Sequence, residues 1–300
     1  MFKICLTSVA ILSLLTGTPN QAAPTFDGER AFYFLEKQCE FGPRAPGSPG
    51  HKKCLDYLVK TLEQHADEVT TQQFMFSFGR PQRTVTATNV ISRFQPTKSK
   101  RILLCAHWDT RPWADSDPNP ENHDKPILGA NDGASGVAVL LHLAELIAAD
   151  PPNVGIDIVL FDAEDAGMQG QDQTWARGSA AFAREYSSSM APNYAILLDM
   201  IGDDDLEIYQ EEFSVTYARP VVDLIWNKAA NLGISEFIPT VGYAVYDDHV
   251  PLLQAGIQCA DVIDFNYPEW HTMEDTPEAC SAASLDKVGR VMTAIIYDEN

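Results

Sequence analysis

Three short segments of this sequence carry side chains that could together bind a metal ion. Asp132 stands within Gly-Ala-Asn-Asp-Gly-Ala-Ser-Gly, Asp165 closes Phe-Asp-Ala-Glu-Asp, and His271 directly follows Trp270. One histidine and two carboxylates form a suitable ligand set for a catalytic zinc ion that keeps its fourth position open. Glu164, the neighbour of Asp165, is then placed to act as a general base. These segments predict a zinc-dependent enzyme.

Polar side chains also stand at or just beyond the ends of four apolar runs that predict buried strands. They are the acidic residues 162–165, Asp199, the segment 107–109 and, a few residues beyond its run, His271. In open α/β sheets, sites form beyond the carboxyl ends of the strands. Grouped carboxylates raise the free energy unless a cation compensates them. We therefore expect the four strand ends to converge on a metal ion.

The elements that must position these residues follow from hydrophobic periodicity. We expect Asp27, Ser48 and Ser284 to cap helices. Apolar strands that alternate with helices predict an α/β single domain with three α/β/α layers and a central mixed, mostly parallel sheet. The expected helices cover 28–41, 49–65, 133–149, 177–185, 221–232, 247–255 and 284–297, and the expected strands cover 69–78, 85–94, 101–107, 156–161, 194–200 and 257–264.

The composition excludes some partners. The 300 residues carry a formal net charge of −21, which argues against nucleic acid, since binding phosphates requires clustered Lys and Arg. A well-solvated surface is the simplest explanation of this acidity, and attraction of substrates with a free amino terminus is the sharper alternative.

The first 23 residues predict a signal peptide. Lys3 supplies a positive charge, residues 4–15 are mostly apolar but too few to span a bilayer, and a polar stretch ends at Ala22 and Ala23. Gln21 makes the cleavage site imperfect. No later segment is long and apolar enough to span a membrane. We expect a secreted or periplasmic protein whose catalytic domain covers residues 24–300 and which is monomeric.

An oxidising compartment permits disulfides. Five cysteines remain after residue 23, and this odd number leaves at least one of them unpaired within the chain. Cys105 lies in an apolar run and predicts a small buried side chain. Pairing of Cys39 with Cys54 and pairing of Cys259 with Cys280 are both open from the sequence.

The chain resembles the glutaminyl-peptide cyclotransferases, a family within the zinc aminopeptidase fold (phosphorylase/hydrolase-like). The resemblance covers about residues 30 to 296, nearly the whole chain after the expected signal peptide. The segments that carry it are Gly-Pro-Arg-x-Pro-Gly-Ser at 42–48, His-x-Asp at 107–109, 129–136, 161–165, Leu-Leu-Asp-Met-Ile-Gly at 197–202, Asp-Asp-His-x-Pro-Leu at 247–252, and Trp-His-Thr-Met at 270–273.

The resemblance implies roles for individual residues. Asp132, Asp165 and His271 match the zinc ligands, and Glu164 matches the base that shuttles a proton. The chain departs from the family in one ligand, because many relatives have Glu where Asp165 stands. The other implied roles are supporting acids at Asp199 and Asp247 and a pocket tryptophan at Trp270.

The pocket walls differ from those of the animal enzymes. In those relatives another pocket tryptophan follows the acidic pair, whereas here residues 166–170 are Ala-Gly-Met-Gln-Gly. Trp175 is the residue of this chain that we expect to fill that place. Trp270 and Tyr267 are expected to wall the pocket, because aromatic faces fit a flat amide and exclude water.

The resemblance implies cyclisation of the N-terminal glutamine of peptides or proteins to pyroglutamate, with release of ammonia and one Zn²⁺ per chain. The alternative is a secreted two-zinc aminopeptidase of the same fold, with His107 and Asp199 as the additional ligands. The Asp-Asp-His segment at 247–249 and the bulky Trp270 favour the cyclase. A third interpretation is an inactive binding module. Such modules tend to lose metal ligands, whereas every ligand position of this chain is filled, which argues against it.

Other polar residues have simpler interpretations. We expect His123 and His142 to be surface and helix histidines, and His249 to be a core or supporting histidine. Residues 203–205, three consecutive aspartates, predict a solvated turn. The sequence leaves open whether Trp108 belongs to the core or to the rim of the pocket.

Overall fold

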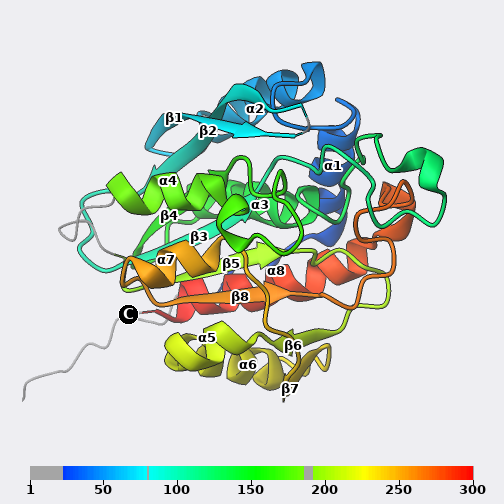
Figure 1. The fold of residues 1–300 in the computed structure, drawn as a ribbon. Coiled ribbons are helices and arrows are strands. Elements are labelled where there is room, and N and C mark those ends of the chain that lie inside the picture. The colour runs from blue at the N-terminus through cyan, green and yellow to red at the C-terminus, as the bar shows by residue number, and fades with distance from the viewer. Residues whose placement is uncertain (1–22, 80, 186–191, 300) are drawn as a thin grey trace, which may run out of the picture.

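The computed structural model describes residues 23–79, 81–185 and 192–299. The predicted signal peptide, apart from residue 23, lies outside these ranges. The described ranges form the predicted α/β architecture around one central sheet (Figure 1). No helix among them is both long enough and apolar enough to cross a membrane.

The central sheet has six strands in the order β1-β2-β4-β3-β5-β8. The four neighbouring strands β4, β3, β5 and β8 are parallel, and β1 and β2 join them as an antiparallel edge on the side of β4. This confirms a mixed, mostly parallel sheet. The bounds are β1 Glu68–Phe78, β2 Arg83–Phe94, β3 Arg101–His107, β4 Gly155–Phe161, β5 Tyr194–Asp199 and β8 Cys259–Ile263.

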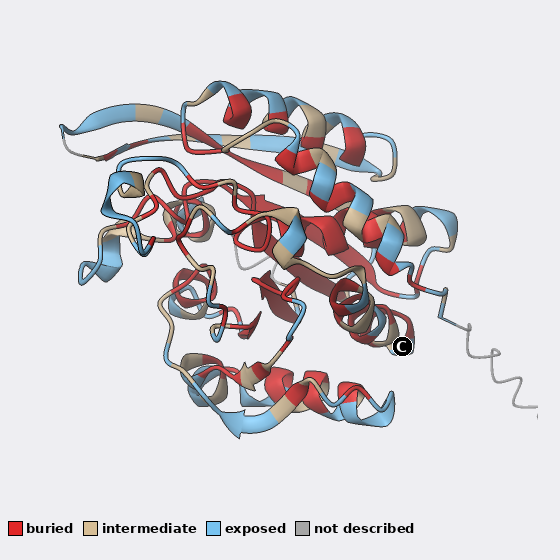
Figure 2. Ribbon diagram, turned by 90° about the vertical axis from the view of Figure 1, so that its right-hand side faces the viewer, coloured by how far each residue is buried: buried red, intermediate tan, exposed pale blue. Residues whose placement is uncertain are grey.

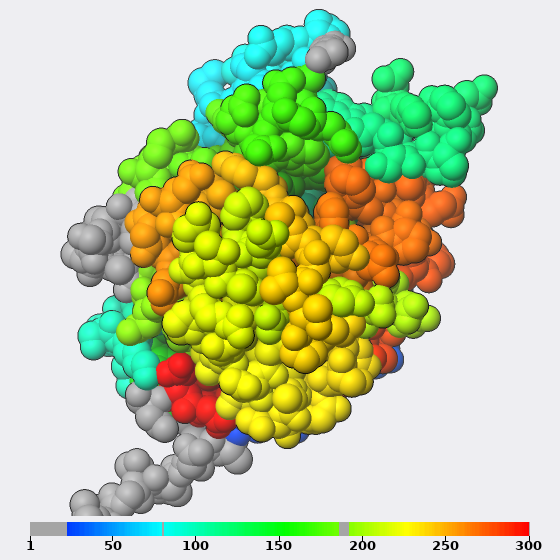
Figure 3. Space-filling view, turned by 60° about the horizontal axis from the view of Figure 1, so that its bottom comes forward, coloured from blue at the N-terminus to red at the C-terminus, as the bar shows by residue number. Residues whose placement is uncertain are grey.

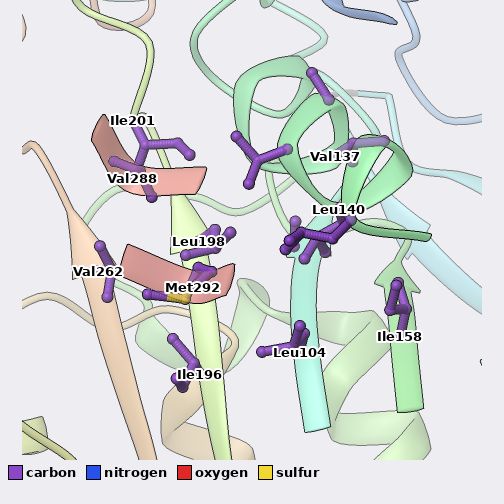
Figure 4. Packing of buried hydrophobic residues seen from close by; sticks show 14 of the residues in the cluster. Leu104, Val137, Leu140, Ile158, Ile196, Leu198, Ile201, Val262, Val288 and Met292 are labelled. Atoms are coloured by element: carbon purple, nitrogen blue, oxygen red, sulfur yellow. The ribbon is translucent and has the colours of Figure 1, made fainter. Parts of the chain in front are cut away.

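The parallel strands are apolar on both faces because helices cover both. On one face Leu104 and Leu198 pack toward Val137 of helix α3 and Met292 of helix α8 (Figure 4). On the other face Leu197 packs in a smaller cluster with residues of α4 and α7. The helices are α1 Gly28–Cys39, α2 Pro49–Leu62, α3 Ala134–Ala149, α4 Arg177–Glu185, α7 His249–Gln254 and α8 Ala282–Asp298.

Burial follows this layering (Figure 2). The central strands are buried along their whole length, whereas much of β1 and the start of β2 are exposed. All five cysteines of the described chain are free thiols, and four of them are buried. Neither of the two candidate disulfide pairings is formed.

A small second sheet was not expected from the sequence. Strand β6, Ile208–Gln210, pairs in parallel with β7, Phe237–Val241, and helices α5, Glu212–Tyr217, and α6, Arg219–Asn231, lie beside them at the lower edge of Figure 1. Only α6 was predicted, as 221–232. The strands are short and β7 is largely exposed, so neither carries the apolar alternation on which strand prediction depends.

The predicted helix caps are confirmed at Asp27 and Ser48, whose side chains accept backbone N–H groups. The last helix differs: Ser281 caps α8 by accepting the N–H of Ala283, and Ser284 is buried within the first turn. Both serines precede the apolar stripe of the helix, so the stripe alone does not distinguish them as caps.

Candidate metal centre and catalytic pocket

The predicted ligands Asp132, Asp165 and His271 meet at the carboxyl edge of the sheet. One ligand atom from each lies within 4.8 Å of the others. His271 Nε2 is 3.1 Å from Asp165 Oδ1 and 3.5 Å from Asp132 Oδ2. All three side chains are at most 3% exposed. The structure thus brings His271, more than a hundred residues along the chain from both aspartates, into one group with them.

Tight backbone turns place each ligand. Gly133, between Asp132 and helix α3, has φ 99°, and a Cβ there would stand 2.5 Å from the carbonyl oxygen of Asp109. Only glycine fits this position, so the start of α3 and the direction of Asp132 are fixed together. His271 itself has φ 58°, a left-handed conformation that few non-glycine residues adopt.

Two aspartates hold the ligand loops by their backbone N–H groups. Asp109 accepts hydrogen bonds from the N–H groups of Glu164 and Asp165, at 3.0 and 3.3 Å. Asp275 accepts from the N–H groups of Asn131 and Asp132, at 2.8 and 3.2 Å. The ligand directions are therefore set by hydrogen bonds to backbone as well as by the sheet.

The chemistry of this group fits a divalent cation. Asp132 Oδ2 and Asp165 Oδ2 are buried and have no hydrogen-bond partner among the described residues. Burial and the neighbouring carboxylate of Asp132 raise the pKa of Asp165 to about 6. A cation placed among these atoms would satisfy the free oxygens and compensate both charges, and one imidazole with two carboxylates suits zinc.

A second group of candidate ligands shares Asp132. His107 Nε2 lies 3.1 Å from Asp132 Oδ1 and 3.1 Å from Asp199 Oδ1. These atoms also lie within 4.8 Å of one another. The two oxygens of Asp132 thus face different histidines, His107 and His271, as a carboxylate between two metal positions would.

The predicted catalytic acids surround the same pocket, which has a volume of about 380 Å³. Burial and the nearby carboxylate of Asp247 raise the pKa of Glu164 well above its usual range. Burial and Asp199 do the same for the pKa of Asp247. Residues that line the pocket include Asp132, Glu164, Asp165, Trp175, Asp199, Tyr246, Asp247, Phe265, Trp270 and His271.

Two predicted wall residues line the pocket and one does not. The rings of Trp270 and Trp175 lie nearly parallel to the His271 imidazole, with centroid distances of 3.7 and 6.0 Å. Tyr267 is not a lining residue: its hydroxyl donates to Asp275 Oδ1 at 2.9 Å, so it supports the ligand loop from behind. Phe265, which packs edge-on against Trp270, occupies the wall instead.

Arg111 and Asp115 are parts of the site that the sequence did not reveal. Arg111 donates two hydrogen bonds to Asp115, at 2.7 and 2.6 Å, and Nη1 lies 2.9 and 3.4 Å from the carbonyl and carboxylate oxygens of Asp165. Asp115 Oδ1 lies 3.4 Å from His271 Nδ1. Arg111 therefore supports one ligand directly and another through Asp115.

The signal for this pair was weak. It consists of an arginine four residues before an aspartate in the long loop 108–130, which the sequence marks only as functional. The arginine also lies 5.0 Å from the ring centre of Trp113 and 4.7 Å from that of Trp175. It thus joins the metal group to a wall of the pocket.

Two segments that the sequence left open or assigned to a simple role, Trp108 and residues 203–205, can now be placed. Trp108 is fully buried in the core, stacked on His51. Among residues 203–205, the last two are exposed as predicted, but Asp203 is buried and pairs with Cys280 in an isolated β-bridge.

In the space-filling view, the chain is hollowed where the segments near residues 170, 245 and 270 meet, in green, yellow-orange and orange (Figure 3). These segments supply lining residues of the pocket. The site is thus open to solvent on the side where Trp175, Tyr246 and Trp270 lie.

Comparison with known proteins gives consistent results. The model of peptidase family M28 matches residues 89–296. The glutaminyl-peptide cyclotransferase of Bos taurus is 23% identical over 85% of this chain and 78% of its own. The crystal structure of Tannerella forsythia glutaminyl cyclase is 39% identical, with a TM-score of 0.88 over 92% of this chain and all of its own. A Bacteroides thetaiotaomicron protein described as a leucine aminopeptidase precursor is 36% identical, with a TM-score of 0.90 over 93% of this chain and 99% of its own.

Proposed function

The chain belongs to peptidase family M28, and we propose that within it this enzyme is a glutaminyl-peptide cyclotransferase. It would convert the N-terminal glutamine of peptides or proteins to pyroglutamate and release ammonia. The observation that carries this proposal is a small pocket in which Trp270 and Trp175 stand beside His271 while the buried acids Glu164 and Asp247 face the same space. Such a pocket suits one folded side chain better than an extended peptide.

One zinc ion would be held by Asp132, Asp165 and His271. When bound, the ion supplies Lewis acidity that polarises the γ-carbonyl of the substrate and favours charge on its oxygen. The chain prepares this position with the backbone hydrogen bonds that Asp109 and Asp275 accept and with those that Arg111 donates to Asp165.

Glu164 carries the proton in the proposed reaction. The α-amine nitrogen forms a bond to the γ-carbon, and the bond from that carbon to the carboxamide nitrogen breaks. Glu164 accepts a proton from the α-amine and returns it to the departing nitrogen, which leaves as ammonia. Burial and the nearby Asp247 raise the pKa of Glu164, which favours a carboxyl group that can hold the transferred proton.

Asp247 supports this transfer. It lies in the same pocket, and its nearby charge is the second cause of the raised pKa of Glu164. Because the two buried carboxyl groups interact, we expect them to titrate as a pair. Asp199 adds a third acid to this side of the pocket.

The walls supply orientation. Ring closure is intramolecular, so fixing the folded rotamer of glutamine contributes much of the acceleration. The flat faces of Trp270, Trp175 and Phe265 can hold an amide and exclude water. We expect the protein to act as a secreted or periplasmic monomer after removal of residues 1–23.

The two-zinc aminopeptidase is the second candidate, and one observation favours it. His107, Asp132 and Asp199 form a second ligand group beside the first. Two activities of the purified protein distinguish the candidates: ammonia release from a glutaminyl peptide and amine release from a leucyl anilide, both measured with metal content per chain. Ammonia alone with one zinc supports the cyclase, amine release with two metals identifies the aminopeptidase, and neither activity identifies a binding module.

A further inference from the structure

A group of buried ionisable side chains lies next to the pocket and takes no part in the proposed chemistry. His249 begins helix α7, Asp261 lies in strand β8 and Glu211 caps helix α5. The three are at most 1% exposed. His249 Nε2 is 3.1 Å from Glu211 Oε2, and its Nδ1 is 3.5 Å from Asp261 Oδ2. We name these three side chains the buried charge network.

The network reaches the pocket through Asp247. A ring nitrogen of His249 and a carboxylate oxygen each of Asp247 and Asp261 lie within 4.8 Å of one another. Both oxygens of Asp261 and Oδ2 of Asp247 are buried and have no hydrogen-bond partner among the described residues. The His249 imidazole lies between these carboxyl groups and Glu211, so it fixes their positions relative to one another.

The network also holds the pocket wall next to Asp247. Glu211 Oε1 accepts the backbone N–H of Val245 at 3.2 Å, and Val245 lines the pocket. Glu211 Oε2 accepts the N–H and hydroxyl of Ser214, at 2.6 and 2.8 Å. The Ser214 hydroxyl in turn accepts the N–H of Asp261 at 3.0 Å. The segment that ends in Asp247 is therefore connected to the network at two points.

We propose that the buried charge network positions Asp247 and the pocket wall at Val245, with His249 and Glu211 as positioning residues. Its effect on turnover rests on the proposed cyclase function, whereas its effect on the wall does not. Neither residue lines the pocket, so each acts through another group. The network acts on the pocket through two contacts, which we call its first and second output. In the first, His249 lies next to Asp247, and in the second, Glu211 contacts both His249 and the backbone of Val245.

Two substitutions of His249 test the first output. In His249→Gln the amide nitrogen can take the place of Nε2 beside Glu211, and in His249→Asn it can take the place of Nδ1 beside Asp261. Neither amide can contact both carboxylates as the imidazole does, so we expect kcat to fall by about 10²-fold in both, the cost of misplacing a reacting group by about 1 Å. KM should stay close to the wild-type value. Unchanged kcat in both variants would overturn the proposal.

The matched control is His142→Gln. His142 is also buried and lies 3.0 Å from a carboxylate, that of Glu145, but it stands on α3 away from the pocket. We expect kcat and KM of this variant to equal those of the wild type. A loss equal to that of His249→Gln would mean that kcat reports general destabilisation, and it would overturn the proposal.

The second output is tested by Glu211→Gln with amide hydrogen exchange. The amide group of glutamine offers one acceptor where the carboxylate offers two, so Val245 N–H should exchange faster and KM should rise together with the fall in kcat. Should this variant fail to fold, His249→Gln provides the contrast, because it leaves the Glu211–Val245 bond intact and should keep Val245 protected. Unaltered protection of Val245 in folded Glu211→Gln contradicts the proposal.

Metal analysis distinguishes the network from a cation site. We expect one zinc per chain in the wild type and in His249→Gln. Loss of an ion from His249→Gln alone would show that Asp247, His249 and Asp261 bind a metal, and this outcome overturns the proposal. If the wild type releases no ammonia, the cyclase function fails, while the exchange of Val245 still decides whether the network holds the wall.

Discussion

The two sides of the pocket treat their carboxylates differently. On the ligand side, Asp165 lies close to Arg111 and His271, and the Arg111 guanidinium and His271 lower the pKa of Asp115 despite its partial burial. On the relay side, burial raises the pKa values of Glu164 and Asp247 well above the usual range. On the ligand side the nearby histidines and Arg111 oppose the effect of burial, so the pKa of Asp132 is lowered and that of Asp165 rises only to about 6. On the relay side the buried carboxyl groups lie close to other acids, which favours their protonated form.

Of the changes that test this difference between the two sides, removing a metal ligand should have the largest effect on activity and zinc content. His271→Ala takes away the imidazole that faces both Asp132 and Asp165, and we expect loss of zinc and of ammonia release. Metal analysis after gel filtration provides the measurement. Full zinc retention in a folded variant would show that the ligand side does not depend on His271.

Removing the proton carrier should leave the ligand side intact. Glu164→Gln keeps the size of the side chain but cannot exchange a proton, so we expect kcat to fall by about 10²-fold or more with zinc retained. Steady-state ammonia release and zinc content together check this expectation. Wild-type turnover in the variant would remove Glu164 from the reaction.

Changing Arg111, the fixed cation beside Asp165, should leave the carboxylates of the ligand side less well compensated, as those of the relay side are. Arg111→Lys keeps a positive charge but loses the paired hydrogen bonds to Asp115, and we expect zinc affinity to fall by about 10-fold to 100-fold. Competition with a chelator measures this affinity. Arg219→Lys, in an exposed pair with Asp223, is the control and should bind zinc as the wild type does. Equal affinity in both variants would mean that Arg111 does not support the ligands.

The smallest expected effect is on the stability of the metal-free protein. Burial raises the pKa of Asp248 to about 7, and burial with the Asp132 charge raises that of Asp275 to about 7. In an unfolded chain an aspartate titrates near pH ~4. Between these values the folded state binds protons that the unfolded state does not, so the free energy of unfolding rises as pH falls.

Thermal unfolding of the metal-free protein should therefore show a higher Tm at pH 5.5 than at pH 8. Asp248→Asn should reduce the slope, because the amide cannot titrate. Bound zinc should reduce it too, because the ion compensates Asp132 beside Asp275. A Tm that rises with pH across this range would contradict the raised pKa values of Asp248 and Asp275.

The sequence predicted the central sheet well because its strands are continuous apolar runs, which depend little on the rest of the chain. It also predicted Asp132, Asp165 and His271 as one group, and the structure brings one ligand atom of each within 4.8 Å of the others. It misplaced Tyr267, because an aromatic two residues along the same loop, Phe265, fits a wall equally well in sequence. Burial of the Tyr267 hydroxyl against Asp275 is a tertiary contact that no local pattern contains.

The sequence also missed the groups that support the site. Arg111 and Glu211 stand in segments without a regular period, and their partners are 54 residues from Arg111, at Asp165, and 34 from Glu211, at Val245. Strands β6 and β7 escaped detection for the same reason, since β6 has three residues and pairs with a segment mostly exposed to solvent. Long-range polar contacts leave no local trace in composition or spacing.

The shared position of Asp132 bears on how many ions the site could take up. Because its two oxygens face His107 and His271, the same coordinating side chains would hold either one ion or two. Which number is bound would then depend on the surroundings of these side chains, such as the charge around His107 and the width of the aromatic entrance. One unchanged set of coordinating side chains is therefore compatible with both chemistries.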